Sequence, residues 1–152
     1  MYTNILVPLD GSKRAEAIID HALHVAKQNN AKVMLLKVED PVMLDRDEVI
    51  DFPEYRMKLQ TQKKQTLSYL NKVQELFIRE DIQSDSLIAY GPVVRSILAA
   101  ATETHTDLIA MATHGIGGLK RVSYGSVAAG VLQAAEIPIL LIRSGDTPSI
   151  GG

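Results

Sequence analysis

The chain has 152 residues, a formal net charge of −2 and 46% apolar residues, which predict one domain with a substantial hydrophobic core. Its sixteen basic residues form only short pairs, so the basic stripe typical of nucleic-acid-binding proteins is missing and we expect no nucleic-acid partner. The lack of cysteine excludes disulfides, thiol catalysis and cysteine-ligated metals. The sequence has no signal peptide and no long apolar run, so we expect a cytoplasmic protein with no membrane insertion.

The first segment predicted to be regular is a buried strand at residues 4–9 (NILVPL), which ends at Asp10-Gly11. Ser12 is a favourable N-cap for a helix that continues to about residue 30. The apolar residues of this helix recur at i, i+3 and i+4, as expected for one buried face. Residues 32–38 (KVMLLKV) predict a second strand.

A loop is predicted at residues 41–55, where prolines and acidic residues break any period. A long helix is predicted to follow, ending at about residue 80. Its expected buried stripe consists of Leu67, Leu70, Val73 and Phe77.

The second half of the chain continues the alternation. A third strand is predicted at residues 82–90, and a turn at Gly91-Pro92 leads into a helix with apolar residues at Val94, Ile97, Leu98 and Ala101. A fourth strand at residues 108–112 and a fifth at residues 137–143 flank the last helix. The apolar positions of that helix are Val127, Val131, Leu132 and Ala135.

This alternation of strands and helices is typical of an α/β fold. It predicts a parallel sheet with helices on both faces, and right-handed crossovers make the sheet doubly wound. We expect a single domain over residues 1–145 and a disordered tail over residues 146–152.

A glycine-rich loop follows the fourth strand. It contains Gly115, Gly117 and Gly118, and Gly125-Ser126 then opens the last helix. Glycines allow positive φ and close approach of a ligand to the backbone, and the amides of a helix N-terminus favour an anion. The arrangement therefore predicts a site for a nucleotide or another phosphorylated ligand.

The spacing of these residues resembles the nucleotide-binding signature of the universal stress protein family, Gly-x2-Gly-x9-Gly-Ser/Thr. Here Ala112 stands at the first glycine, Gly115 at the second, and Gly125-Ser126 at the end. NILVPLDGS (residues 4–12) is similar to the family's opening strand and turn, and IPILLIR (residues 137–143) to its closing strand. The resemblance covers about residues 1–143.

The resemblance implies the strand order 3-2-1-4-5, with the ligand site at the carboxyl ends of the strands where the order reverses. It implies that ATP is the ligand. The adenine would lie at the backbone of Val38, with Pro8 and Asp10 beside the base and ribose. The phosphates would be held by Ala112, Thr113, His114, Gly115, Ile116, Gly117, Gly118, Gly125, Ser126 and Val127.

Several of these residues also have a structural interpretation. Asp10 is favoured in an Asx turn or as an N-cap, and this structural role is compatible with binding the ribose or the base. The glycines could form a flexible surface loop, and the Ser126 hydroxyl could cap the last helix instead of binding phosphate. The methyl group of Ala112 departs from the family signature and would weaken nucleotide binding by about 1 kcal/mol.

No metal site is predicted from the histidines. His21 and His24 are three residues apart on the first helix, but the sequence fixes no third ligand. His114 lies in the glycine loop, where it could contact a phosphate or cap the fourth strand, and His105 is expected at the surface. The metal that we expect is a Mg²⁺ ion carried by the nucleotide phosphates, which needs few protein ligands.

Three known catalytic motifs are missing from the sequence: Gly-x4-Gly-Lys-Ser/Thr, Gly-x-Ser-x-Gly and His-Glu-x2-His. Glu39 and Asp40 could act as a base or could be solvent-facing turn residues. We expect ATP hydrolysis to be slow at most. Three functions remain open: a nucleotide-responsive regulatory protein in a stress response, a protein-interaction dimer without nucleotide, and a slow ATP-cleaving enzyme.

A homodimer is expected through the fifth strand. In the implied order this strand lies at the sheet edge, and its apolar run at residues 137–142 would invite aggregation if left unpaired. Proteins that this chain resembles pair the strand with its twofold mate. In the alternative, helices cover the strand, Pro138 protects its edge, and the protein is a monomer.

Overall fold

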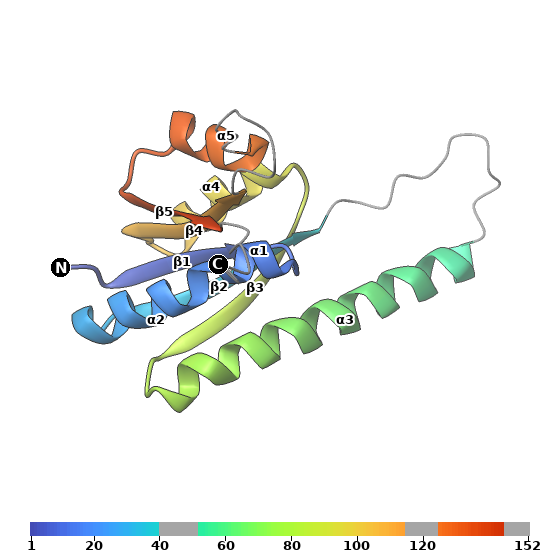
Figure 1. The fold of residues 1–152 in the computed structure, drawn as a ribbon. Coiled ribbons are helices and arrows are strands. Elements are labelled where there is room, and N and C mark those ends of the chain that lie inside the picture. The colour runs from blue at the N-terminus through green and yellow to red at the C-terminus, as the bar shows by residue number, and fades with distance from the viewer. Residues whose placement is uncertain (40–51, 115–124, 145–152) are drawn as a thin grey trace, which may run out of the picture.

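The computed structural model describes residues 1–39, 52–114 and 125–144. Within these ranges, the strands form one five-stranded parallel sheet in the order β3-β2-β1-β4-β5 (Figure 1). The implied strand order and the predicted doubly wound α/β fold are therefore confirmed. In chain order the elements are β1 (Asn4–Leu9), α1 (Lys13–Glu16), α2 (Ile18–Asn29), β2 (Lys32–Glu39), α3 (Phe52–Arg79), β3 (Ser84–Tyr90), α4 (Val93–Glu103), β4 (Leu108–His114), α5 (Ser126–Ala134) and β5 (Ile139–Ser144).

Two hydrophobic cores lie on opposite faces of this sheet. Side chains alternate between the faces of a strand, so Ile5 and Val7 of β1 pack with α2 and α3, whereas Leu6 packs with α4 and α5. Figure 1 shows these helix pairs on the two sides of the sheet. Because both faces are covered, the central strands are apolar at consecutive positions instead of alternating with polar residues.

The central strand β1 pairs unequally with its two neighbours. Its register with β2 includes six residue pairs, from Asn4–Lys32 to Leu9–Lys37, whereas its register with β4 includes only Ile5–Leu108 and Leu6–Ile109. Pro8 has no amide hydrogen and cannot donate to a ladder. β1 and β4 are thus paired near their amino ends and unpaired toward their carboxyl ends.

Asp107 holds these two strands together at their amino ends. Its carboxylate accepts hydrogen bonds from the Thr3 amide at 2.8 Å, the Thr3 hydroxyl at 2.9 Å and the Asn4 amide at 3.0 Å. Burial raises the pKa of Asp107, but the hydrogen bonds outweigh burial and leave the pKa below its ordinary value. Asp107 therefore joins the start of β4 to the start of β1, at the end of the sheet away from their unpaired segments.

The first predicted helix is in fact two helices. Ser12 is the N-cap as expected, and its hydroxyl accepts from the Ala15 amide at 3.1 Å. The Ala17 amide then donates to the Arg14 carbonyl only three residues back, which interrupts the α-helical pattern. The helical segment therefore splits into a short α1 and the longer α2.

The predicted loop at residues 41–55 is wrong at its end, because α3 already begins at Phe52. Pro53 is in the first turn of α3. The amides of a first turn have no partner within the helix, so the missing N–H of proline costs no helical hydrogen bond there. Residues 41–51 lie outside the described ranges, as does the predicted tail at residues 146–152.

Two residues predicted in buried stripes are exposed. Leu67 is 39% exposed and Leu132 is 46% exposed. On α3 the buried stripe runs instead through Thr66, Leu70, Val73 and Phe77, at i, i+4, i+7 and i+11. The prediction assigned Leu67 to the stripe because it is apolar. The helical period instead places the neighbouring polar residue, Thr66, in the core.

Close packing of α5 on α4 depends on Gly130. A Cβ atom at this position would lie 2.7 Å from Val94 Cγ2 and 3.3 Å from Val94 Cγ1, and valine is stiff at χ1. We expect Gly130→Ala to lower the free energy of unfolding by about 1 kcal/mol, because an overpacking cost of about 1–3 kcal/mol exceeds the gain of about 1 kcal/mol in helix propensity. Denaturant unfolding measures this difference.

The control removes the obstacle on α4. In a Val94→Ala background the same glycine replacement should raise stability by up to about 1 kcal/mol, since only the helix-propensity gain remains. Equal destabilisation by Gly130→Ala in both backgrounds would show that the Val94 contact is not its cause.

Candidate functional site

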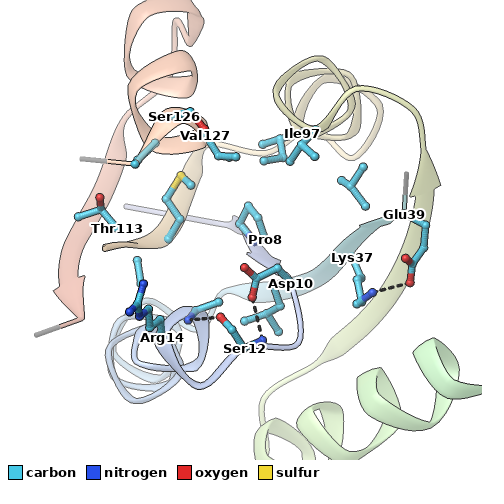
Figure 2. A pocket seen from close by; sticks show the side chains of 18 of the residues that line it. Pro8, Asp10, Ser12, Arg14, Lys37, Glu39, Ile97, Thr113, Ser126 and Val127 are labelled. Atoms are coloured by element: carbon cyan, nitrogen blue, oxygen red, sulfur yellow. Dashed lines mark hydrogen bonds and ion pairs between the residues drawn. The ribbon is translucent and has the colours of Figure 1, made fainter. Parts of the chain in front are cut away.

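A pocket of about 490 Å³ opens at the carboxyl ends of β1, β2 and β4, on the side where β1 and β4 are unpaired. Figure 2 shows side chains from these strands and from α1, α4 and α5 around it. This is the position at which the strand order reverses, where open α/β sheets bind ligands. The lining residues are Pro8, Leu9, Asp10, Ser12, Arg14, Ala15, Lys37, Val38, Glu39, Gln62, Val93, Ile97, Met111, Ala112, Thr113, Gly125, Ser126, Val127 and Ala128.

The end of β1 supplies Pro8 and Asp10, as the sequence led us to expect. Asp10 Oδ1 accepts a hydrogen bond from the Ser12 amide at 2.8 Å, which forms the Asx turn of the structural interpretation. Gly11 between them has a φ of +87°, a conformation that favours glycine. Asp10 is exposed and lines the pocket, so the turn presents its carboxylate to a ligand.

The end of β2 supplies Val38, and its Lys37 and Glu39 form a buried polar cluster with Gln62 and Thr66 of α3. The Glu39 carboxylate accepts from the Lys37 ammonium and the Thr66 hydroxyl through Oε1, and from the Gln62 amide through Oε2 at 2.9 Å. Burial raises the pKa of Glu39, but these hydrogen bonds and the positive charge of Lys37 outweigh burial and leave the pKa below its ordinary value.

This cluster corrects one interpretation of the sequence. Glu39 is 8% exposed, so it is not a solvent-facing turn residue, whereas Asp40 lies outside the described residues. The signal was present in the strand, because Lys37 and Glu39 are two apart and therefore point to the same face. Opposite charges at that spacing, directly after the apolar run at residues 33–36, indicate a buried ion pair. The partners from α3 could not be identified without the fold.

The ends of β4 and the start of α5 form another wall of the pocket. Ala112 and Thr113 lie on β4, and the Thr113 carbonyl accepts from the Ser144 hydroxyl of β5 at 2.8 Å. α5 begins after Gly125, whose φ is +66°. Ser126 and Val127, the first two residues of α5, also line the pocket.

The Ser126 hydroxyl does not cap α5. The N-cap position is Gly125, and among the described residues no side chain makes a capping hydrogen bond there. Ser126 is exposed and lines the pocket. The N-terminus of α5, with the first amides of the helix, therefore borders the pocket. Such an end favours an anion through its amides and its dipole.

The pocket therefore brings together eight of the thirteen expected site residues, from segments far apart in the sequence: Pro8, Asp10, Val38, Ala112, Thr113, Gly125, Ser126 and Val127. Of the remaining five, Gly115, Ile116, Gly117 and Gly118 lie outside the described residues. His114 is the last residue of β4, and its side chain also lies outside the description.

Other lining residues were not identified from the sequence. Arg14 and Ala15 belong to α1, and Ser12 is the N-cap of that helix. Gln62 belongs to α3, and Val93 and Ile97 belong to α4. Helix residues that reach a site at the end of a sheet leave no motif in the sequence, because their position depends on how each helix crosses the sheet.

The histidines of the described chain form no metal centre. His21, His24 and His105 are exposed, and within the described ranges no group of three His, Asp or Glu residues is placed to hold a metal ion. In the same ranges no helix combines the length and the apolar character needed to cross a bilayer.

Comparisons with known proteins agree on one family. The model of the universal stress protein family matches residues 1–143. Universal stress protein YxiE of Bacillus subtilis (strain 168) is 29% identical over 148 residues, covering 94% of this chain and 100% of the relative. The solved structure of universal stress protein UspA from Lactobacillus plantarum is 26% identical, with a TM-score of 0.78, and the alignment covers 93% of this chain and 98% of that one.

A more distant structure carries a ligand. A universal stress protein family protein from Arabidopsis thaliana, solved with AMP bound, is 17% identical, with a TM-score of 0.70 and 97% of each chain covered. At this identity the likeness shows the shared fold. The family match over nearly the whole chain identifies this protein: it belongs to the universal stress protein family.

Proposed function

We propose that this protein binds ATP in the pocket at the carboxyl ends of β1, β2 and β4, and acts as a nucleotide-responsive regulatory protein in a cytoplasmic stress response. The observation that carries the proposal is the start of α5, which opens on the pocket without a side-chain cap among the described residues. That end of the helix suits a phosphate group. A family member with AMP bound has the same fold.

In this proposal the base lies near the backbone of Val38, and Asp10 accepts hydrogen bonds from the ribose hydroxyls. Both residues line the pocket on the β1 and β2 side, opposite α5. The phosphates then lie near Gly125 and Ser126, with Mg²⁺ carried by the phosphates. The Gly115–Gly118 loop, which lies outside the described residues, remains part of the proposed phosphate site through its sequence spacing.

Mass spectrometry of the ligand released from freshly purified protein tests the proposal. We expect an adenine nucleotide, because the proposed site combines base, ribose and phosphate contacts. A protein that is purified without nucleotide and takes none up in solution would contradict the proposal.

Ala112 favours a second candidate function. Its methyl group lines the pocket at the position where the family signature has glycine. Lost space at this point would favour a protein-interaction dimer that works without nucleotide. A slow ATP-cleaving enzyme is the third candidate, and we expect a turnover below about one per second, at the low end of enzyme rates.

We also propose a homodimer formed through β5. This strand is at one edge of the sheet, and the four apolar residues Ile139–Ile142 are only partly buried in the single chain, unlike Ile5–Val7 of the central strand. Pairing with a twofold mate would satisfy the edge and cover these side chains.

Sedimentation measures the oligomeric state. Wild-type protein should sediment as a dimer of about 33 kDa, which is twice the chain mass of 16.6 kDa. Leu140→Lys with Ile142→Lys should give a monomer or an unfolded chain, which circular dichroism distinguishes. A wild-type monomer at high micromolar concentration would contradict the dimer.

A further inference from the structure

Four ionisable side chains are among the described lining of the pocket, and two of them are cations. Lys37 is paired with Glu39 on the β2 wall, and both side chains are largely buried. Asp10 is bonded to the Ser12 amide at the end of β1. Arg14, the other cation, is exposed and comes from α1.

Arg14 and Lys37 lie on different sides of the pocket. α1 packs against β4 and β1, whereas Lys37 belongs to β2, and the sheet order places β1 between β2 and β4. Figure 2 shows the Arg14 side chain directed toward Thr113 at the end of β4, with Lys37 and Glu39 across the pocket. The guanidinium therefore lies on the β4 side of the pocket.

Both α1 and α5 pack against β4, so the β4 side of the pocket has two positive features. One is the N-terminus of α5, which no side chain of the described residues caps, and the other is the full charge of Arg14. A guanidinium has five N–H donors in a planar fork that fits phosphate oxygens, so a contact with a neighbouring residue still leaves further donors for a ligand.

We propose that Arg14 is a phosphate-binding residue that makes the affinity of the pocket depend on the number of phosphate groups of the nucleotide. The inference rests on the proposed nucleotide site and adds a residue that lies outside its signature. The contribution of Arg14 increases from AMP to ATP, because the Coulomb attraction grows with ligand charge. Because Arg14 is exposed, added salt screens this contribution.

Calorimetric titrations with ATP, AMP and adenosine test the role of Arg14. Arg14→Gln should weaken ATP binding about tenfold, weaken AMP binding less, and leave adenosine binding unchanged. Lys13→Gln is the matched control, since Lys13 is the preceding residue of α1, is exposed, and is not among the lining residues. It should change each of the three affinities less than about twofold.

The possible results separate the two proposals. Wild-type protein that binds ATP, together with an Arg14→Gln variant of equal ATP affinity, would overturn the role of Arg14 and leave the nucleotide site standing. Equal losses in the Arg14 and Lys13 variants would also overturn it, because the effect would then come from overall charge. Wild-type protein that binds no nucleotide would overturn both proposals. Arg14→Lys retains the charge on α1 but not the planar fork, so it should lose less ATP affinity than Arg14→Gln.

Discussion

Replacing Glu39 by glutamine is expected to lower the free energy of unfolding by about 2–4 kcal/mol. Glutamine has nearly the same shape, but it leaves the Lys37 ammonium largely buried without its counter-charge. Removing one partner of a buried ion pair costs about 3–5 kcal/mol, and water in the pocket beside Lys37 reduces this cost. The amide group would also face the Thr66 hydroxyl and the Gln62 amide, which both donate to Glu39 in the native protein.

Two comparisons isolate the ion pair. In a Lys37→Met background, Glu39→Gln should cost clearly less, since no charge is left behind. Glu75→Gln should change stability by less than about 0.5 kcal/mol, because Glu75 and Arg79 form an exposed pair 4.0 Å apart. If the Glu39 and Glu75 variants lose equal stability in denaturant unfolding, the buried cluster does not contribute as proposed.

The cost of the Glu39 replacement should depend on pH. The folded-state pKa of Glu39 is below its ordinary value of 4.5, so its contribution to stability is complete above that value and is lost as the pH falls through the folded pKa. The difference between wild type and Glu39→Gln should therefore be constant near neutral pH and shrink at acidic pH. A difference that grows on acidification would have the wrong sign.

Replacing Ser126 by aspartate is expected to weaken ATP binding at least about tenfold, or roughly 1.4 kcal/mol. The new carboxylate would lie in the first turn of α5, at the end of the helix that is proposed to hold the phosphates. Like charges repel, and the aspartate would itself use the positive helix end. For the same reason the fold should tolerate this change, because an acidic residue in the first turn stabilises a helix by about 0.3–1 kcal/mol.

The ligand series is the internal control for this variant. Adenosine has no phosphate, so Ser126→Asp should leave its affinity nearly unchanged. Ser126→Ala removes one hydroxyl donor without adding charge, and it should lower ATP affinity less than the aspartate does. Equal effects of Ser126→Asp on ATP and adenosine would place the phosphates away from α5.

The fold was largely predictable because the hydrophobic period is strong. Apolar runs such as residues 4–9 and 32–38 mark buried strands, and both are strands in the structure. The errors occurred where local rules compete. Pro53 was interpreted as a break although it stands in the first turn of α3, and Leu67 and Leu132 were assigned to the core by residue type although the helix turns them outward.

The candidate site was predictable only where it is built from local sequence. Asp10 and Gly125-Ser126 are at ends of strands or helices, where turn chemistry leaves a recognisable pattern, and the structure brings them to one pocket. Gln62 and Arg14 reach the same pocket because of the way α3 and α1 cross the sheet. No spacing in the sequence encodes that crossing, so these residues could be found only from the fold.

Calorimetric titration of the wild-type protein with ATP, in the presence and absence of Mg²⁺, tests the central proposal most directly. We predict saturable heat with one nucleotide bound per chain, because the described residues of each chain line a single pocket where β1 and β4 are unpaired. We also predict that AMP competes for the same site. The absence of heat at millimolar nucleotide would contradict the proposed function.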